Sequence, residues 1–165
     1  MAALLSSCTT DTTGGNSGGG GALVEVNYES PERFTDMSRS FGSPRGADAG
    51  YLDELRNHLQ TAAADRLPAG YTLSVTITDV DMAGDFEPQR GAEFSDVRIV
   101  KSIYPPRIDL RYRLTGPDGV VRSEGDRRLR NTSFDLTIRS LNREDPLRHE
   151  KALIDDFLSD LRGEI

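Results

Sequence analysis

The sequence predicts an α+β domain of two layers: a mostly antiparallel sheet of at least four strands, with two helices on one face of that sheet. Two observations lead to this class. Apolar and polar residues alternate in several short segments, which is typical of half-buried strands, and apolar residues recur at helical spacing in two longer segments. Their order is strand, helix, strand, strand, strand, helix, so each layer can cover the apolar side of the other.

The clearest strand is Tyr71–Asp81, where apolar residues alternate with threonine and serine as far as Ile77. Residues 79–90 then form an acidic loop that contains glycine. An earlier segment, Ala22–Tyr28, alternates in the same way. If these two strands are neighbours, the helix between them makes them parallel, with a right-handed crossover.

The first helix is predicted from about Ala47 to Arg66, with Asp48 as its N-cap. Pro68 and Gly70 end it. His58 lies off its apolar stripe, and we expect that side chain to face solvent. The stripe consists of Leu52, Leu55, Leu59, Ala62 or Ala63, and Leu67.

A long loop, residues 29–46, precedes this helix. Loops of such length without secondary structure are uncommon in compact domains and are often functional. The interpretation that we favour is an ordered lid that packs Phe34 and Phe41 on the core.

A hairpin is predicted from two alternating strands, Arg107–Thr115 and Val120–Arg130, around the turn residues 116–119. The preferred register pairs Leu114 with Val121. A bulged glycine in the turn would shift the pairing by one residue and set Tyr112 against Glu124. The preferred register also places Leu110 opposite Gly125 and Arg111 opposite Glu124, with a further bulge possible near Gly125.

Charges of both signs alternate on the outer face of this hairpin, which is typical of a solvated face rather than a nucleic-acid surface. Before the hairpin, Val97, Ile99 and Val100 suggest a short edge strand. After it, residues 131–143 contain an apolar alternation of uncertain type.

The second helix is predicted to start sharply, with Asp145 as its N-cap and Pro146 at its first position. His149 is expected to face solvent. The apolar stripe consists of Leu147, Ile154, Phe157, Leu158 and Leu161. The residues expected to face outward are Arg148, Glu150, Lys151, Asp155 and Asp156.

The N-terminus has the pattern of a bacterial lipoprotein. Residues 4–8 resemble a lipobox, the recognition sequence for lipid attachment, because two leucines and two serines precede Cys8. Residues 1–8 therefore look like the remnant of a lipoprotein signal, with lipidation at Cys8. Residues 9–21 are rich in Gly, Ser and Thr and predict a flexible tether, with residues 22–165 as a single domain. Thr9, rather than aspartate, favours the outer membrane. The alternative is a cytoplasmic protein with an incidental cysteine.

The charge composition of the chain limits the classes of partner that it is expected to bind. The formal net charge of −7 argues against non-specific binding to nucleic acid or to an anionic lipid surface. The expected partners are the membrane, through a lipid on Cys8, and an envelope protein.

Several motifs resemble a bacterial family known only as domain of unknown function 3016, whose members look like secreted or envelope proteins. The resemblance covers about Leu23–Leu161 and implies no established activity, so it carries over no catalytic residue. The motifs are Asp79–Pro88, Val97–Val100, Tyr104–Tyr112, Asp145–Arg148, Glu150–Lys151 and Asp155–Asp156.

The acidic run invites a calcium interpretation, but the EF-hand motif fails; a cation site of another kind is the alternative to the acidic solvated loop that we favour. Asp79, Asp81 and Gly84 fit the first, third and sixth positions of an EF-hand, but Ala83 and Arg90 stand where oxygen ligands belong. Two isolated histidines and one cysteine make neither a zinc site nor a Cys–His pair. The sequence indicates no cofactor, no metal ligands and no catalytic residues.

One sheet edge is the candidate binding site. If the two N-terminal strands are parallel, the loops that follow them leave the same edge, where ligands of open α/β sheets tend to bind. A purely structural interpretation, which we favour, is that Arg33 or Arg107 neutralises the aspartates and pins the loops. The candidate residues are Arg33, Phe34, Asp36, Asp79, Asp81, Asp85, Glu87, Tyr104 and Arg107.

The preferred function is that of a lipid-anchored or secreted envelope protein, on the periplasmic face of the outer membrane or free in the periplasm. It would bind a partner without catalysis. The alternative is a small hydrolase or cation-dependent enzyme that uses the acidic loop Asp79–Glu87.

Overall fold

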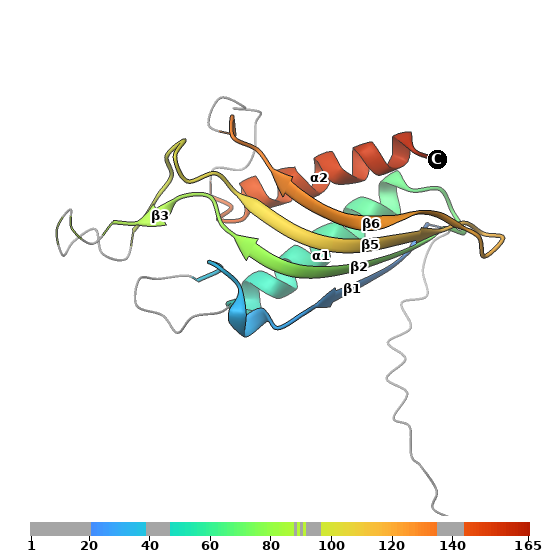
Figure 1. The fold of residues 1–165 in the computed structure, drawn as a ribbon, viewed down its shortest axis with the longest axis horizontal. Coiled ribbons are helices and arrows are strands. Elements are labelled where there is room, and N and C mark those ends of the chain that lie inside the picture. The colour runs from blue at the N-terminus through green and yellow to red at the C-terminus, as the bar shows by residue number, and fades with distance from the viewer. Residues whose placement is uncertain (1–20, 39–46, 88, 90, 92–96, 135–143) are drawn as a thin grey trace, which may run out of the picture.

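The computed structural model describes residues 21–38, 47–87, 89, 91, 97–134 and 144–165. It contains a mixed four-stranded sheet in the order β1-β2-β5-β6, with both helices packed on one face (Figure 1). The predicted α+β class is therefore confirmed. The sheet strands are β1 (Leu23–Tyr28), β2 (Thr72–Asp81), β5 (Arg107–Thr115) and β6 (Val121–Arg130). The helices are α1 (Ala49–Arg66), α2 (Arg148–Gly163) and the short 3-10 helix η1 (Pro31–Arg33). A separate two-stranded ribbon consists of β3 (Asp85–Phe86) and β4 (Arg98–Ile99).

The core lies between β2 and the helices. β1 and β2 pair in parallel, as expected from the helix that joins them, and β2 also pairs with β5. Leu73, Val75 and Ile77 on β2 are fully buried, whereas the alternate residues Ser74 and Thr76 are only half-buried. The period-2 pattern in the sequence thus marks the side of the sheet that the helices cover.

Both helices begin close to the predicted positions. Asp48 caps α1, because its Oδ1 accepts a hydrogen bond from the Tyr51 backbone N–H at 3.1 Å. Tyr51 is buried in the core, where the sequence had indicated Leu52, which is half-buried. α2 begins at Arg148 rather than at Pro146, and Asp145 instead accepts a hydrogen bond from the Leu147 N–H in the preceding turn.

Three side chains expected to face solvent do not. Glu150 is completely buried, because it lies four residues before Ile154 and so shares the apolar stripe of α2. The His149 ring packs edge-on against Phe134, with 4.9 Å between ring centroids. His58 joins the two helices, since its Nε2 lies 3.1 Å from Asp155 Oδ1.

The hairpin register differs from the preferred prediction. Leu114 lies opposite Ser123, and Tyr112 lies opposite Gly125. Pro117 cannot adopt the positive φ that a tight two-residue turn needs, so the chain makes a longer turn with Gly119 at φ +77°. A bulge between Leu114 and Thr115 then shifts the pairing once more. The predicted bulge near Gly125 is absent from the described hairpin.

Some predictions fall outside the described residues: the lipobox, most of the tether, the packing of Phe41 and the alternation within residues 135–143. Phe34 is buried in the core, as expected. Within the described part of the chain, neither helix has the length and apolar character needed to cross a membrane.

Candidate functional site

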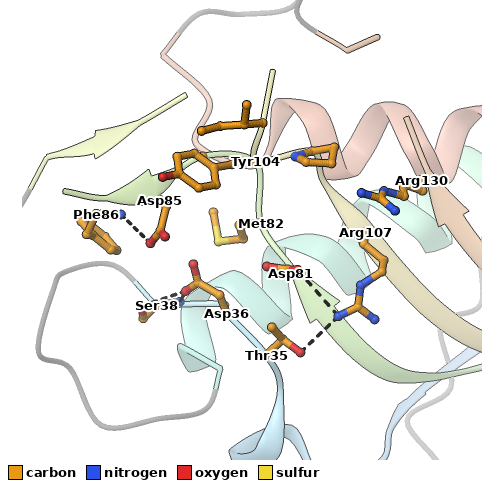
Figure 2. Close-up of a pocket in the computed structure, with 13 residues that line it drawn as sticks. Thr35, Asp36, Ser38, Asp81, Met82, Asp85, Phe86, Tyr104, Arg107 and Arg130 are labelled. Atoms are coloured by element: carbon orange, nitrogen blue, oxygen red, sulfur yellow. Dashed lines mark hydrogen bonds and ion pairs between the residues drawn. The ribbon is translucent and has the colours of Figure 1, made fainter. Parts of the chain in front are cut away.

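A cavity of about 550 Å³ lies at the edge of the sheet where β2 ends and β5 begins (Figure 2). The loop after β1 runs beside the end of β2, because the Asp36 N–H donates to the Val80 carbonyl and the Met82 N–H donates to the Asp36 carbonyl. The two loops therefore leave the same edge, as the parallel pairing requires. The lining residues are Thr35, Asp36, Ser38, Asp81, Met82, Gly84, Asp85, Phe86, Ile103, Tyr104, Pro105, Arg107 and Arg130.

The structure brings five of the nine candidate residues to the cavity wall: Asp36, Asp81, Asp85, Tyr104 and Arg107. The other four lie elsewhere. Arg33 is exposed on η1, and Phe34 packs in the core against Tyr28. Asp79 is held beside the cavity by Thr35 and Arg107, and buried Glu87 pairs with Lys101.

Arg107 fastens the loop after β1 to the sheet. Its guanidinium lies 2.8 Å from Asp79 and 2.6 Å from Asp109. Thr35 donates to Asp79 through its N–H at 2.7 Å and its hydroxyl at 2.6 Å. Partial burial raises the pKa of Asp79, but the hydrogen bonds from Thr35 and Arg107 outweigh burial and hold this pKa below its ordinary value. Of the two arginines proposed to pin the loops, Arg107 has this role.

Arg98 is a site residue that sequence reasoning missed. Its guanidinium binds both Asp36 carboxylate oxygens, at 2.7 and 3.0 Å, and donates to the carbonyls of Ser38 and Gly84. The same group lies 4.5 Å from the centroid of the Phe86 ring. Arg98 therefore ties the β3–β4 ribbon to the loop after β1, and Asp36 is neutralised by it.

Gly84 sets how closely β4 approaches the turn between β2 and β3. It has φ +83°, and a Cβ at this position would lie 2.7 Å from the Ile99 carbonyl oxygen. Its N–H donates to the Tyr104 carbonyl at 3.0 Å. Only glycine fits both the backbone conformation and the close contact.

Three charged side chains on the wall are not neutralised by a close ion pair within the described residues. Asp81 lies 3.7 Å from Arg107, which is already bound more closely by Asp79 and Asp109. Burial raises the pKa of Asp81, and the nearby charge of Asp36 adds to that effect against the opposing charge of Arg107. Asp85 accepts a hydrogen bond from the adjacent Phe86 N–H. Arg130 lies opposite Arg107 across β5 and β6.

Glu150 lies behind the cavity wall and was also missed. Its Oε1 accepts a hydrogen bond from the Ala83 N–H at 2.7 Å, between the lining residues Met82 and Gly84. Its Oε2 has no hydrogen-bond partner among the described residues. Burial raises the pKa of Glu150 to about 7, although the Ala83 hydrogen bond acts in the opposite direction. The spacing of α2 could have revealed it, because position 150 continues the apolar stripe.

The described part of the cavity wall combines carboxylates with guanidinium groups. Within the described ranges, no three histidine, cysteine, aspartate or glutamate side chains are placed to hold a metal ion. The lining residues include no histidine. Their three hydroxyl groups, on Thr35, Ser38 and Tyr104, donate to Asp79, Asp36 and Glu87 respectively.

The family model for a protein of unknown function, DUF3016, matches residues 22–160. The chain belongs to the DUF3016 family. The match confirms the resemblance seen in the motifs and spans every strand of this DUF3016 domain and most of α2. No curated protein matches the chain. Membership therefore assigns the DUF3016 cavity no activity and no ligand.

Proposed function

We propose that this DUF3016 protein is a non-catalytic binding module of the bacterial envelope, and that the cavity at the end of β2 is its ligand site. The observation that carries the binding function is the set of charges of both signs on the wall of a cavity of about 550 Å³. Small-molecule sites in proteins have volumes of this order and contain a few polar groups that orient the ligand. The ligand is free in the periplasm or belongs to a lipid or partner protein.

The envelope location is supported by the lipobox pattern at Leu4–Cys8 and by the Gly-rich segment after it. The test is to express the gene together with the genomic DNA upstream of the Met1 codon in a bacterial host and to feed the cells an alkyne-tagged fatty acid. We expect the label on the protein and the protein in the membrane fraction. Cys8→Ser should abolish both. A wild-type protein in the cytosol, with a Cys8 thiol that reacts with maleimide, would contradict the anchor.

The binding function can be tested before the ligand is known. Ile103 lines the cavity and is 69% exposed, so Ile103→Trp should obstruct the cavity and leave the core intact. The soluble domain is screened by thermal shift against a library of charged metabolites. We expect ligands that stabilise the wild type and Val120→Trp, a matched exposed control, but not Ile103→Trp. A library without any such ligand would contradict a binding site here.

One observation favours the enzyme alternative. Asp79 and Asp81 are two residues apart on β2, yet the pKa of Asp79 is lowered and that of Asp81 is raised. Carboxylates with divergent pKa values are used for acid–base catalysis. Against this, Asp79 is bound by Thr35 and Arg107. Turnover of ester or glycoside substrates that Asp81→Asn abolishes, with and without EDTA, would favour the hydrolase over the binding module.

A further inference from the structure

We infer that the cavity binds a small zwitterion. Its primary ammonium lies between Asp81 and Asp85, and its carboxylate or phosphate lies against Arg130. This inference rests on the proposed binding function and specifies the chemistry of the ligand. An amino terminus and a carboxylate on a short peptide have this chemistry, and so does a phosphoethanolamine headgroup.

The acidic part of the wall contains carboxylates that the described residues do not fully neutralise. Asp36 is neutralised by Arg98, so it contributes shape rather than charge. Asp81 shares Arg107 with Asp79 and Asp109, at the longer distance of 3.7 Å, and Asp85 forms no ion pair within the described residues. An ammonium has three donors and can hydrogen-bond two carboxylates at once.

The basic part of the wall contains one guanidinium that forms no ion pair with a described residue. Arg107 is used by Asp79 and Asp109 at 2.8 and 2.6 Å. Arg130 lies directly opposite Arg107 in the β5–β6 register and forms no ion pair in the described part of the chain. Because Arg107 is already paired, an anionic group of the ligand would bind Arg130, whose exposed guanidinium can donate to a carboxylate or phosphate.

The two charged side chains without an ion pair in the described residues, Asp85 and Arg130, lie at opposite ends of the cavity (Figure 2). Figure 2 shows the arginines together where β5 and β6 meet, Asp85 at the far side, and Asp81 between them. A purely anionic ligand that reached across the cavity would meet the carboxylates, and a purely cationic one would meet the arginines. A zwitterion satisfies both ends. Met82 and Tyr104 provide an apolar wall for the carbon skeleton between its two charges.

The test is a cycle of ligands and variants, measured by isothermal titration calorimetry. The ligands are trialanine with free termini, its N-acetyl form and its C-terminal amide. Each modified peptide lacks one of the two ligand charges and should bind roughly tenfold or more weakly than the free peptide. The reason is that a charge-assisted hydrogen bond contributes on the order of 1.5–3 kcal/mol. The variants are Asp85→Asn and Arg130→Gln, with Arg113→Gln on the open face of the sheet as the control.

The inference requires that ligand and protein changes match. Arg130→Gln should weaken binding of the free peptide roughly tenfold and leave binding of the C-terminal amide unchanged. Asp85→Asn should weaken binding of the free peptide roughly tenfold and leave binding of the N-acetyl peptide unchanged. Arg113→Gln should change neither. Losses that are equal for all three peptides, or acetylated and amidated peptides that bind as tightly as the free one, would overturn the inference.

A second arm identifies the source of the zwitterion. Glycerophosphoethanolamine, and vesicles that contain phosphatidylethanolamine, are titrated beside vesicles of phosphatidylglycerol. Binding of the headgroup but not of trialanine indicates a lipid source, and the reverse indicates a peptide source. If neither zwitterion binds while a singly charged library compound does, the inference fails and the binding function stands. If nothing binds in a manner blocked by Ile103→Trp, both fail.

Discussion

Glu150 is a carboxyl group with no exposed surface, and its side chain supports the backbone of the cavity wall through Ala83. Burial raises its pKa in the folded protein from 4.5 to about 7. A raised folded-state pKa means that the stabilising contribution is present in full below pH 4.5 and is lost as the pH rises through about 7. The loss is about 3 kcal/mol, since one pKa unit corresponds to about 1.4 kcal/mol.

Glu150→Gln tests this directly, because glutamine keeps the shape and cannot ionise. Relative to the variant, the wild type should lose about 3 kcal/mol of unfolding free energy between pH 4.5 and pH 8. Urea unfolding at several pH values measures the difference. The neighbouring His149, whose pKa burial lowers to about 4, loses its contribution as the pH falls from 6.5, but it does so equally in both proteins.

Asp156→Asn is the control on the same helix, because Asp156 is exposed. Its difference from the wild type should stay within about 0.5 kcal/mol across this pH range. Parallel curves for the wild type and Glu150→Gln would show that the buried carboxyl is not responsible.

At the scale of residues, the sequence indicates the members of the site better than their partners. Asp81, Asp85 and Arg107 could be proposed because they follow or begin predicted strands. The pair of Asp36 and Arg98 could not, since these residues are 62 positions apart and only the folded chain brings them together. Periodicity reports burial and not partnership.

At the scale of elements, the β3–β4 ribbon depends on one glycine. Gly84→Ala combines a positive φ with a Cβ that would lie 2.7 Å from a carbonyl oxygen. We expect it to cost about 2–4 kcal/mol, from backbone strain together with overpacking. Gly119→Ala is the matched comparison, with φ +77° and nothing within 4 Å of the added Cβ, and should cost only about 1 kcal/mol.

Urea unfolding gives both free energies, and hydrogen exchange shows where each variant opens. Faster exchange in Gly84→Ala should be concentrated at the amides of Phe86, Arg98 and Ile99. Equal losses of unfolding free energy in the two variants would mean that the ribbon accommodates the added Cβ by moving, at no cost in stability.

The long elements were predictable and the short ones were not. β2, β5 and the helices are long enough for several periods of their pattern. β3 and β4 have two residues each, which is too short to show an alternation of apolar and polar residues. Only the apolar residues near Val97 indicate a short edge strand. The hairpin register failed for another reason: the turn geometry, rather than the strand pattern, decides it.

For the whole molecule, the sheet places the cavity and the start of β1 at opposite ends. Leu23, where β1 begins, aligns with Thr72 and Thr115, whereas the cavity residues Asp81 and Arg107 pair at the other end of β2. The ten residues of β2 separate these ends by about 30 Å. If Cys8 is lipidated, the domain is attached by the end farther from its ligand site.

This arrangement predicts that the cavity of the anchored protein faces away from the bilayer. In a protein lipidated at Cys8, which is the only cysteine of the chain, a second cysteine can be spin-labelled selectively. Labels at Val120→Cys, at the end of the sheet where β1 begins, and at Ile103→Cys, on the cavity wall, are compared in vesicles with nickel-chelating lipids. The label at position 120 should relax faster, because a tether of this composition reaches on the order of 20 Å, less than the length of the sheet. Faster relaxation at position 103, or equal rates at both, would show that the cavity lies at the membrane and would favour a ligand taken from the lipid surface.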